Sequence, residues 1–284
     1  LTLSTRGYAL LRDYLMIVWA KILRKRIVLL LRGKGYSRKK GIQARMVYRM
    51  FRGSSVIQHT ELLFPDIRHL PHKKVYFLAN GLPDQSPCTG SEPLARHPGE
   101  PVQIIFLSNL LEAKGLFVLV EALDRLVQKG LVLVCHFIGA WTRENSALRF
   151  RQLVRERKLG KFIGEIGPRY GDDKFTFLSR MDLMAFPTLN EAFGNVVLEA
   201  MMCSKPVVAS REGSLPKIIV DGETGLLVET GQVEPLAQAM EILIRDEKLR
   251  QRMGQNGRRR YLEQFTMEHF RREALTIFSE ILSS

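Results

Sequence analysis

The sequence predicts an α/β protein built from two Rossmann-like, doubly wound domains. Short apolar runs of strand length alternate with longer segments of helical period along the 284 residues. This alternation is typical of parallel sheets covered by helices on both faces. It is interrupted once, between residues 85 and 100, where Pro and Gly residues accumulate. We therefore expect a smaller domain before the interruption and a larger one after it.

Residues 1–84 are expected to form the first domain. Its predicted helices span residues 9–23 and 41–52, and its predicted strands lie in the segments KRIVLLLRGKGY, SSVIQHTELLF and KVYFLANGLPD, each with the loop or turn that follows it. Fewer residues precede the interruption than the roughly 100 of a typical domain. We therefore expect this domain to be incomplete, with its beginning missing from the chain.

Residues 101–265 are expected to form the second domain, and residues 85–100 a linker, because Pro and Gly discourage both helix and strand. The predicted strands are VQIIFLSNL, LVLVCHFIGA, FIGEIG, DLMAFPT and PVVAS. The predicted helices cover residues 115–130, 144–160, 172–181, 195–204, 233–245 and 247–263. A last helix within residues 266–284 is expected to pack back toward the first domain. In such a sheet, ligands bind beyond the carboxyl ends of the strands.

The composition is that of a folded globular protein with a strong positive charge. Apolar residues make up 45% of the chain, charged residues make up 25%, and the net charge is +14. These values exclude a disordered chain, and the charge predicts affinity for phosphates, nucleic acid or an anionic lipid surface. We expect no nucleic-acid partner, because basic and aromatic residues do not form a stacking platform and no helix-turn-helix or zinc pattern occurs.

Cysteine and histidine spacing predicts no metal site. The three cysteines lie far apart, show no CxxC spacing and are expected to be reduced thiols, and the six histidines are scattered. The first residues show no signal-peptide pattern. The longest uncharged run there, Tyr14 to Ala20, is far shorter than the ~20 residues that span a bilayer. We expect a cytoplasmic protein.

The segment EAFGNVVLE, residues 191–199, places two carboxylates around the start of a predicted helix. The first amides of a helix lack internal partners and favour a phosphate, and Gly194 lets the backbone approach closely. Glu199 lies about one turn into the helix among apolar neighbours and can bind a vicinal diol such as a ribose. The pattern indicates a nucleoside-diphosphate site with Glu191 on its sugar side. For Glu191 alone, a carboxylate that merely favours the helix dipole is the better explanation.

The segments PTLNEAFGNVVLEAMMCSKPVVAS and GSLPKIIVDGETGLLV resemble the donor-site signature of retaining family 4 glycosyltransferases. The resemblance extends from about Gly7 to the end of the chain. It implies the GT-B fold, in which two Rossmann-like domains face a cleft. It also implies an enzyme that moves a sugar, with retained configuration, from a nucleoside-diphosphate-sugar to a glycan or lipid-linked acceptor, as in surface polysaccharide biosynthesis.

By this resemblance, Glu191 is expected to contact the transferred sugar and Glu199 to hold the ribose. The backbone amides expected at the diphosphate are those of Phe193, Gly194, Asn195 and Val196.

The segment FLSNLLEAKGL resembles the family loop in which a basic pair neutralises the diphosphate. Lys114 matches the family lysine, and Asn109 stands where many members have arginine. A plain surface lysine is the alternative for Lys114. We expect Glu191 and Lys114 to be the catalytic pair. The segment beginning GPRYGDD resembles the nucleobase side of the family site, so Arg169 and Tyr170 are further donor-binding candidates.

No cofactor or metal is expected, because Lys114 and the helix start can stabilise the leaving diphosphate. Asp172 and Asp173 are adjacent, but they open a predicted helix, where acidic side chains favour the dipole. The sequence names no nucleophile, so retention follows from the resemblance alone.

Two positions depart from the family pattern. LLLRGKG resembles a segment with histidine before the glycine, whereas this chain has Arg32 before Gly33, and both are candidates for the acceptor side. Lys217 stands where an acidic residue is common. A truncated, non-catalytic protein that still binds nucleotide-sugar is therefore the alternative function. A sugar-nucleotide epimerase of the same fold is a further one.

We expect a monomer whose partners are the nucleotide-sugar donor and the acceptor. The basic positions from Arg24 to Arg52 also suggest peripheral contact with the anionic inner face of the plasma membrane. A solvated basic face is the alternative for these positions.

Overall fold

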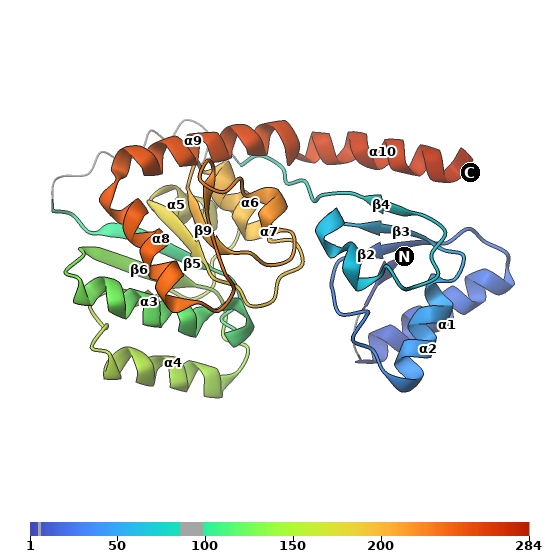
Figure 1. Cartoon of the computed structure of the whole chain (residues 1–284), viewed down its shortest axis with the longest axis horizontal. Helices are drawn as coiled ribbons and strands as arrows, with labels where there is room; N and C mark the ends of the chain where they lie inside the picture. The colour runs from blue at the N-terminus through green and yellow to red at the C-terminus, as the bar shows by residue number, and fades with distance from the viewer. Residues whose placement is uncertain (5–6, 86–98, 284) are drawn as a thin grey trace. The chain divides into compact units, whose positions relative to one another are not determined.

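The computed structural model describes residues 1–4, 7–85 and 99–283. It contains two compact units, one formed by Leu1–Gly81 with Met267–Ser284 and the other by Leu82–Thr266 (Figure 1). Most of the expected linker, residues 86–98, lies outside the described residues. The predicted α/β class is confirmed, because both units contain a parallel sheet with helices packed on it.

The first unit is built on a four-stranded parallel sheet. Its strand order is β1 (Thr2–Leu3), β2 (Val28–Leu31), β3 (Ser55–Gln58) and β4 (Val75–Phe77). Its helices are α1 (Gly7–Ile22), α2 (Gly41–Phe51), the short 3-10 helix Glu61–Asp66 and α10 (Met267–Ser283). The sequence did not predict β1, because a two-residue strand has no periodicity to detect.

Alternate side chains of β2 face different helices in this unit. Leu29 and Leu31 belong to one buried cluster with residues of α1 and α2. Val28 and Leu30 pack on a second cluster that contains Ile281 of α10. The period of two in a strand therefore lets one sheet hold helices on both of its faces.

The second unit is built on a six-stranded parallel sheet. Its strand order is β10 (Gly225–Val228), β9 (Val207–Ser210), β8 (Leu183–Phe186), β5 (Val102–Leu107), β6 (Leu133–Ile138) and β7 (Ile163–Glu165). The helices are α3 (Leu116–Gln128), α4 (Glu144–Glu156), α5 (Gly171–Ser179), α6 (Asn195–Met202), α7 (Leu215–Ile218), α8 (Val233–Arg245) and α9 (Glu247–Gln264). The sequence did not predict β10 or the four-residue helix α7.

The two faces of this sheet carry different helices. Cys135 and Phe137 of β6 lie in a buried cluster with residues of α3, α4 and α8. His136, between them, points to the opposite face, where its ring meets Phe177 of α5 edge-on. This doubly wound arrangement agrees with the sequence prediction.

One cysteine expectation is wrong. Cys135 is a free, buried thiol, but Cys203 is disulfide-bonded. Distance along a sequence does not report distance in space, so wide cysteine spacing is weak evidence for reduced thiols. Cys88 lies outside the described residues.

The strand order of the second unit positions a ligand site. β5 has β6 on one side and β8 on the other, so the chain leaves β5 in one direction and later returns to its other side. At such a switch point, the loops that follow the two neighbouring strands separate and leave room for a ligand. Here these loops are residues 108–115 after β5 and 187–194 after β8.

Candidate functional site

The loops after β5 and β8 are joined by backbone hydrogen bonds. The Ala113 carbonyl accepts hydrogen bonds from the amides of Leu189 at 2.9 Å and Asn190 at 3.1 Å. Gly115 makes this approach possible, because a Cβ at position 115 would lie 1.8 Å from the Pro187 carbonyl oxygen. Its φ of +78° is also a conformation that favours glycine. The two loops therefore hold Lys114 and Glu191 at one place.

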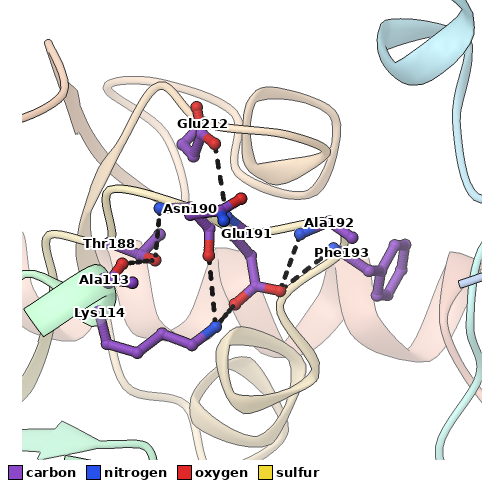
Figure 2. A network of polar contacts seen from close by, with 8 residues as sticks. All are labelled: Ala113, Lys114, Thr188, Asn190, Glu191, Ala192, Phe193 and Glu212. Atoms are coloured by element: carbon purple, nitrogen blue, oxygen red, sulfur yellow. Dashed lines mark hydrogen bonds and ion pairs between the residues drawn. The ribbon is translucent and has the colours of Figure 1, made fainter. Parts of the chain in front are cut away.

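Lys114 and Glu191 form an ion pair at this place (Figure 2). Lys114 Nζ lies 2.8 Å from Glu191 Oε2, and the two side chains are 21% and 15% exposed. Glu191 Oε1 accepts a hydrogen bond from the Ala192 amide at 2.9 Å, and the Phe193 amide lies 3.4 Å away (Figure 2). A lysine and two amides just before α6 thus gather around one anionic group. The same donors suit a phosphate.

The loop after β9 supports the segment that carries Glu191. The Ser214 amide donates to the Ala192 carbonyl at 3.1 Å. A Cβ at Gly213, where φ is +56°, would lie 2.2 Å from the Glu191 carbonyl oxygen. Gly194, with φ of +99°, caps the start of α6, and a Cβ there would lie 2.6 Å from a Leu215 methyl carbon. The sequence prediction assigned Gly194 to close approach, and the structure shows that its near neighbour is Leu215.

A second lysine–glutamate pair involves Glu199, which lies about one turn into α6. Lys174 Nζ, from the first turn of α5, is 2.7 Å from Glu199 Oε1, and the two side chains are 20% and 13% exposed. The other carboxylate oxygen, Glu199 Oε2, is buried without a hydrogen-bond partner. An unpaired buried acceptor of this kind costs about 1–3 kcal/mol. A ligand hydroxyl that donated to Oε2 would remove this cost.

The family model for glycosyl transferases group 1 matches residues 94–260, which is more than half of the chain. The chain belongs to this family. The match covers the Lys114–Glu191 pair, the Lys174–Glu199 pair and α6, which carries Glu199.

Curated relatives of this group 1 chain include two named glycosyltransferases. The capsular polysaccharide biosynthesis glycosyltransferase CapM of Staphylococcus aureus is 29% identical over 62% of this chain and 46% of its own length. The D-inositol 3-phosphate glycosyltransferase of Corynebacterium aurimucosum is 32% identical over 54% of this chain and 37% of its own length. The matched part thus spans less than half of each relative.

A solved structure extends the fold comparison to both units. The HepE protein of Anabaena, solved in complex with UDP, matches with a TM-score of 0.82 over 94% of this chain and 76% of its own. The two sequences are 19% identical, so this likeness concerns the fold. The group 1 chain thus has the GT-B fold that the sequence resemblance implied.

Most of the remaining donor-side candidates are exposed, whereas Lys114 and Glu191 are half-buried. Asn109 is exposed in the loop after β5. Arg169 pairs with Asp173 at 3.1 Å, and Tyr170, which precedes α5, is 76% exposed. Asn195 is exposed and Val196 half-buried in the first turn of α6.

Arg32 and Gly33 belong to the first unit, in the loop that follows β2. Arg32 is exposed and Gly33 is half-buried. The loop is anchored just beyond them by Asp66, whose carboxylate accepts the amides of Gly35 at 2.7 Å and Tyr36 at 3.0 Å. The acceptor-side candidates therefore stand on an ordered loop at the carboxyl end of a strand.

Sequence reasoning missed Lys174, although it named Glu199. Lys174 lies in a predicted helix, but its contact with Glu199 joins residues 25 positions apart on two helices. No local pattern reports such a contact. Asp172 and Asp173 lie in the first turn of α5, where the dipole explains them. No group of three His, Cys, Asp or Glu side chains that could hold a metal occurs in residues 1–4, 7–85 and 99–283.

Proposed function

We propose that this chain is a retaining glycosyltransferase that transfers a sugar from a nucleoside-diphosphate-sugar to a glycan or lipid-linked acceptor. The observation that carries the proposal is the buried, partnerless Glu199 Oε2, about one turn into α6. A ribose hydroxyl is the kind of donor that this oxygen lacks. Family membership, the named activities of CapM and the inositol-phosphate enzyme, and the HepE complexes with UDP and UDP-glucose all support it.

The geometry suggests how a donor would enter this site. The diphosphate would take the place that the Glu191 carboxylate holds beside Lys114 Nζ and the amides of Ala192 and Phe193. Glu191 would then be free to turn toward the hydroxyls of the sugar. This exchange keeps one anion beside Lys114 at every stage, so its partly buried charge is always neutralised.

Transfer breaks the bond between the sugar and the diphosphate. The leaving diphosphate then carries one more negative charge than it did in the donor. A preorganised lysine and helix-start amides aimed at that charge stabilise the transition state more than the ground state. This chain's own residues can therefore supply the leaving-group stabilisation, and we propose that no metal is required. Retention of configuration rests on the resemblance to family 4.

The proposal is tested by isothermal calorimetry with UDP-glucose and a GDP-sugar, with EDTA present. We expect one of the two donors to bind, and the Glu199→Ala variant to bind it ten- to a hundred-fold more weakly, as the loss of charge-assisted hydrogen bonds predicts. The matched control is Glu263→Ala, which removes an exposed carboxylate from α9. The absence of binding to either nucleotide, or equal binding by Glu199→Ala, would overturn the proposal.

Turnover is a separate measurement. Release of the nucleoside diphosphate from the bound donor, alone or with a glycan or lipid-linked acceptor, reports transfer. Binding without turnover would instead support the alternative of a nucleotide-sugar-binding protein without catalysis. Arg32, Asn109 and Lys217 are the substitutions from the family pattern that such a result would implicate.

A further inference from the structure

Helix α1 of the first unit exposes an unusually apolar surface. Tyr8 is 92% exposed, Leu11 47%, Leu15 53%, Trp19 65% and Ile22 69%. We call these five residues, with Met16 at 51%, the exposed face of α1. Large apolar side chains gathered on one surface mark an interaction site more often than single exposed ones do.

The spacing of these residues makes the surface continuous. Five of them, Tyr8, Leu11, Leu15, Trp19 and Ile22, follow one another at intervals of three or four positions and so share one side of the helix, and Met16 adjoins Leu15. The opposite side, with Leu10, Asp13 and Ile17, is buried against the rest of the unit. The helix is therefore already held in place by its inner side. The exposed face is not required for that packing.

The part of the sequence that contains α1 carries almost all of the net charge of the protein. Residues 1–52 contain fourteen of the 43 basic residues and one of the 29 acidic residues, so they carry +13 of the net charge of +14. The single acidic residue, Asp13, is fully buried and paired with Arg12 at 2.7 Å. No exposed carboxylate therefore offsets the cations in the described part of this segment.

Several of these cations border the exposed face of α1. Arg12 and Lys25 line the same shallow surface hollow as Leu15 and Trp19. Arg49 of α2 donates a hydrogen bond to the Tyr14 hydroxyl at 3.2 Å, which places α2 beside α1. An apolar strip bordered by Lys and Arg side chains is the pattern of a helix that lies in the plane of a membrane interface.

We propose that the exposed face of α1 docks on a lipid bilayer with anionic headgroups. The apolar side chains would enter the boundary between headgroups and acyl chains, while the cations contact the headgroups. At 16 residues the helix is shorter than the ~20 needed to span a bilayer, and none of the described helices is long and apolar enough to do so. The proposal is independent of donor binding, whose residues lie in the second unit.

The charge argues against a second copy of the chain as the occupant. Pairing two exposed faces would bring two segments of +13 together. Like charges placed opposite one another in an interface cost several kcal/mol, whereas an anionic leaflet gains from every cation. The same charge that disfavours self-association therefore favours the lipid surface.

Trp19 supplies a direct probe for the test. The chain has one other tryptophan, Trp141, so a Trp141→Phe background leaves Trp19 as the only indole. Vesicles of pure phosphatidylglycerol are expected to shift its emission to the blue, and vesicles of pure phosphatidylcholine to do so much less. Flotation of the full chain with the same vesicles gives the partition coefficient.

The variants separate the apolar from the ionic contribution. Leu11→Ser/Leu15→Ser is expected to lower partitioning onto phosphatidylglycerol at least ten-fold, because two large apolar contacts are lost. The control Leu262→Ser/Leu275→Ser removes two leucines of similar exposure, 47% and 69%, from α9 and α10, and should partition as the wild type does. Arg24→Glu/Lys25→Glu should lower partitioning at least ten-fold, since each cation contributes about five-fold. Circular dichroism checks that every variant is folded.

Three results would overturn the proposal. The first is an unshifted Trp19 spectrum with phosphatidylglycerol. The second is partitioning that survives Leu11→Ser/Leu15→Ser, which would mean that charge alone adsorbs the protein. The third is a wild-type dimer in sedimentation analysis that Leu11→Ser/Leu15→Ser dissociates, which would assign the exposed face of α1 to a second copy.

Discussion

Lys174 satisfies only one oxygen of Glu199: its Nζ lies 2.7 Å from Oε1, while Oε2 is buried without a partner. A carboxylate in this state has its charge neutralised and still has an acceptor to offer. A ribose that donates to Oε2 can therefore add to the ion pair without breaking it. This differs from the Lys114–Glu191 pair, where both carboxylate oxygens already have donors.

Glu199 should recognise the ribose of the nucleotide. We predict that the wild type binds UDP at least ten-fold more tightly than 2′-deoxy-UDP, because the deoxy compound lacks one hydroxyl donor. In Glu199→Ala, both ligands should bind weakly and with nearly equal affinity. Competition calorimetry measures the ratio. A ratio that survives the substitution would place the ribose elsewhere.

The Lys174–Glu199 pair should be energetically coupled. We predict that Lys174→Met lowers the unfolding free energy of the second unit by about 1–3 kcal/mol, because it leaves a poorly exposed carboxylate without its cation. The double variant Lys174→Met/Glu199→Gln should recover part of that loss, since no unpaired charge remains. Urea unfolding of the two single variants and the double variant completes the cycle. Additive losses would show that the two side chains act independently.

Lys114 should act on the phosphates and not on the nucleoside. We predict that Lys114→Met weakens UDP binding by ten- to a hundred-fold and leaves uridine binding unchanged within a factor of about two. The UDP affinity of the variant should also depend less on salt, since one cation has been removed. Equal losses for UDP and uridine would instead point to a displaced Glu191 loop.

The loops after β5 and β8 should tolerate no side chain at Gly115. We predict that Gly115→Ala lowers the unfolding free energy by about 2 kcal/mol or more, because φ is +78° and the new Cβ would lie 1.8 Å from the Pro187 carbonyl oxygen. Gly160→Ala is the control, since no atom lies within 4 Å of a Cβ there. Urea unfolding monitors both variants. A small effect at Gly115 would show that the two loops can separate at little cost.

The sequence predicted the elements whose side chains repeat and missed those whose position depends on a neighbour. The apolar run of β5 and the amphipathic period of α3 were found, because each carries a local pattern. β10 was missed because it begins at Gly225, whose lack of a side chain is needed against the Val207 carbonyl. That requirement is set by β9 and cannot be read locally.

The same distinction holds in the candidate site. Lys114 and Glu191 follow predicted strands, so their shared location could be inferred from the switch-point rule of a doubly wound sheet. The ion pair that joins them was not predicted, and neither was Lys174. Both contacts depend on the side-chain conformations that form when the loops and helices pack together. A local pattern of strands and helices contains no information on these conformations.

The loop that carries Arg32 and Gly33 should lose its anchor in acid. Burial raises the pKa of Asp66, but the Ser37 hydroxyl and the amides of Ser37, Tyr36 and Gly35 outweigh it and hold the pKa below the usual 3.8. A carboxyl whose folded pKa is depressed stabilises the protein at pH values above its ordinary pKa. This stabilisation is lost as the pH falls through the folded pKa.

Asp66→Asn should therefore lower the unfolding free energy by about 1–3 kcal/mol near neutral pH. The difference from the wild type should shrink as the pH falls below 3.8. Urea unfolding at several pH values measures it, with the exposed Asp172→Asn as control. A difference that does not vary with pH would show that the carboxylate charge is not what holds the loop.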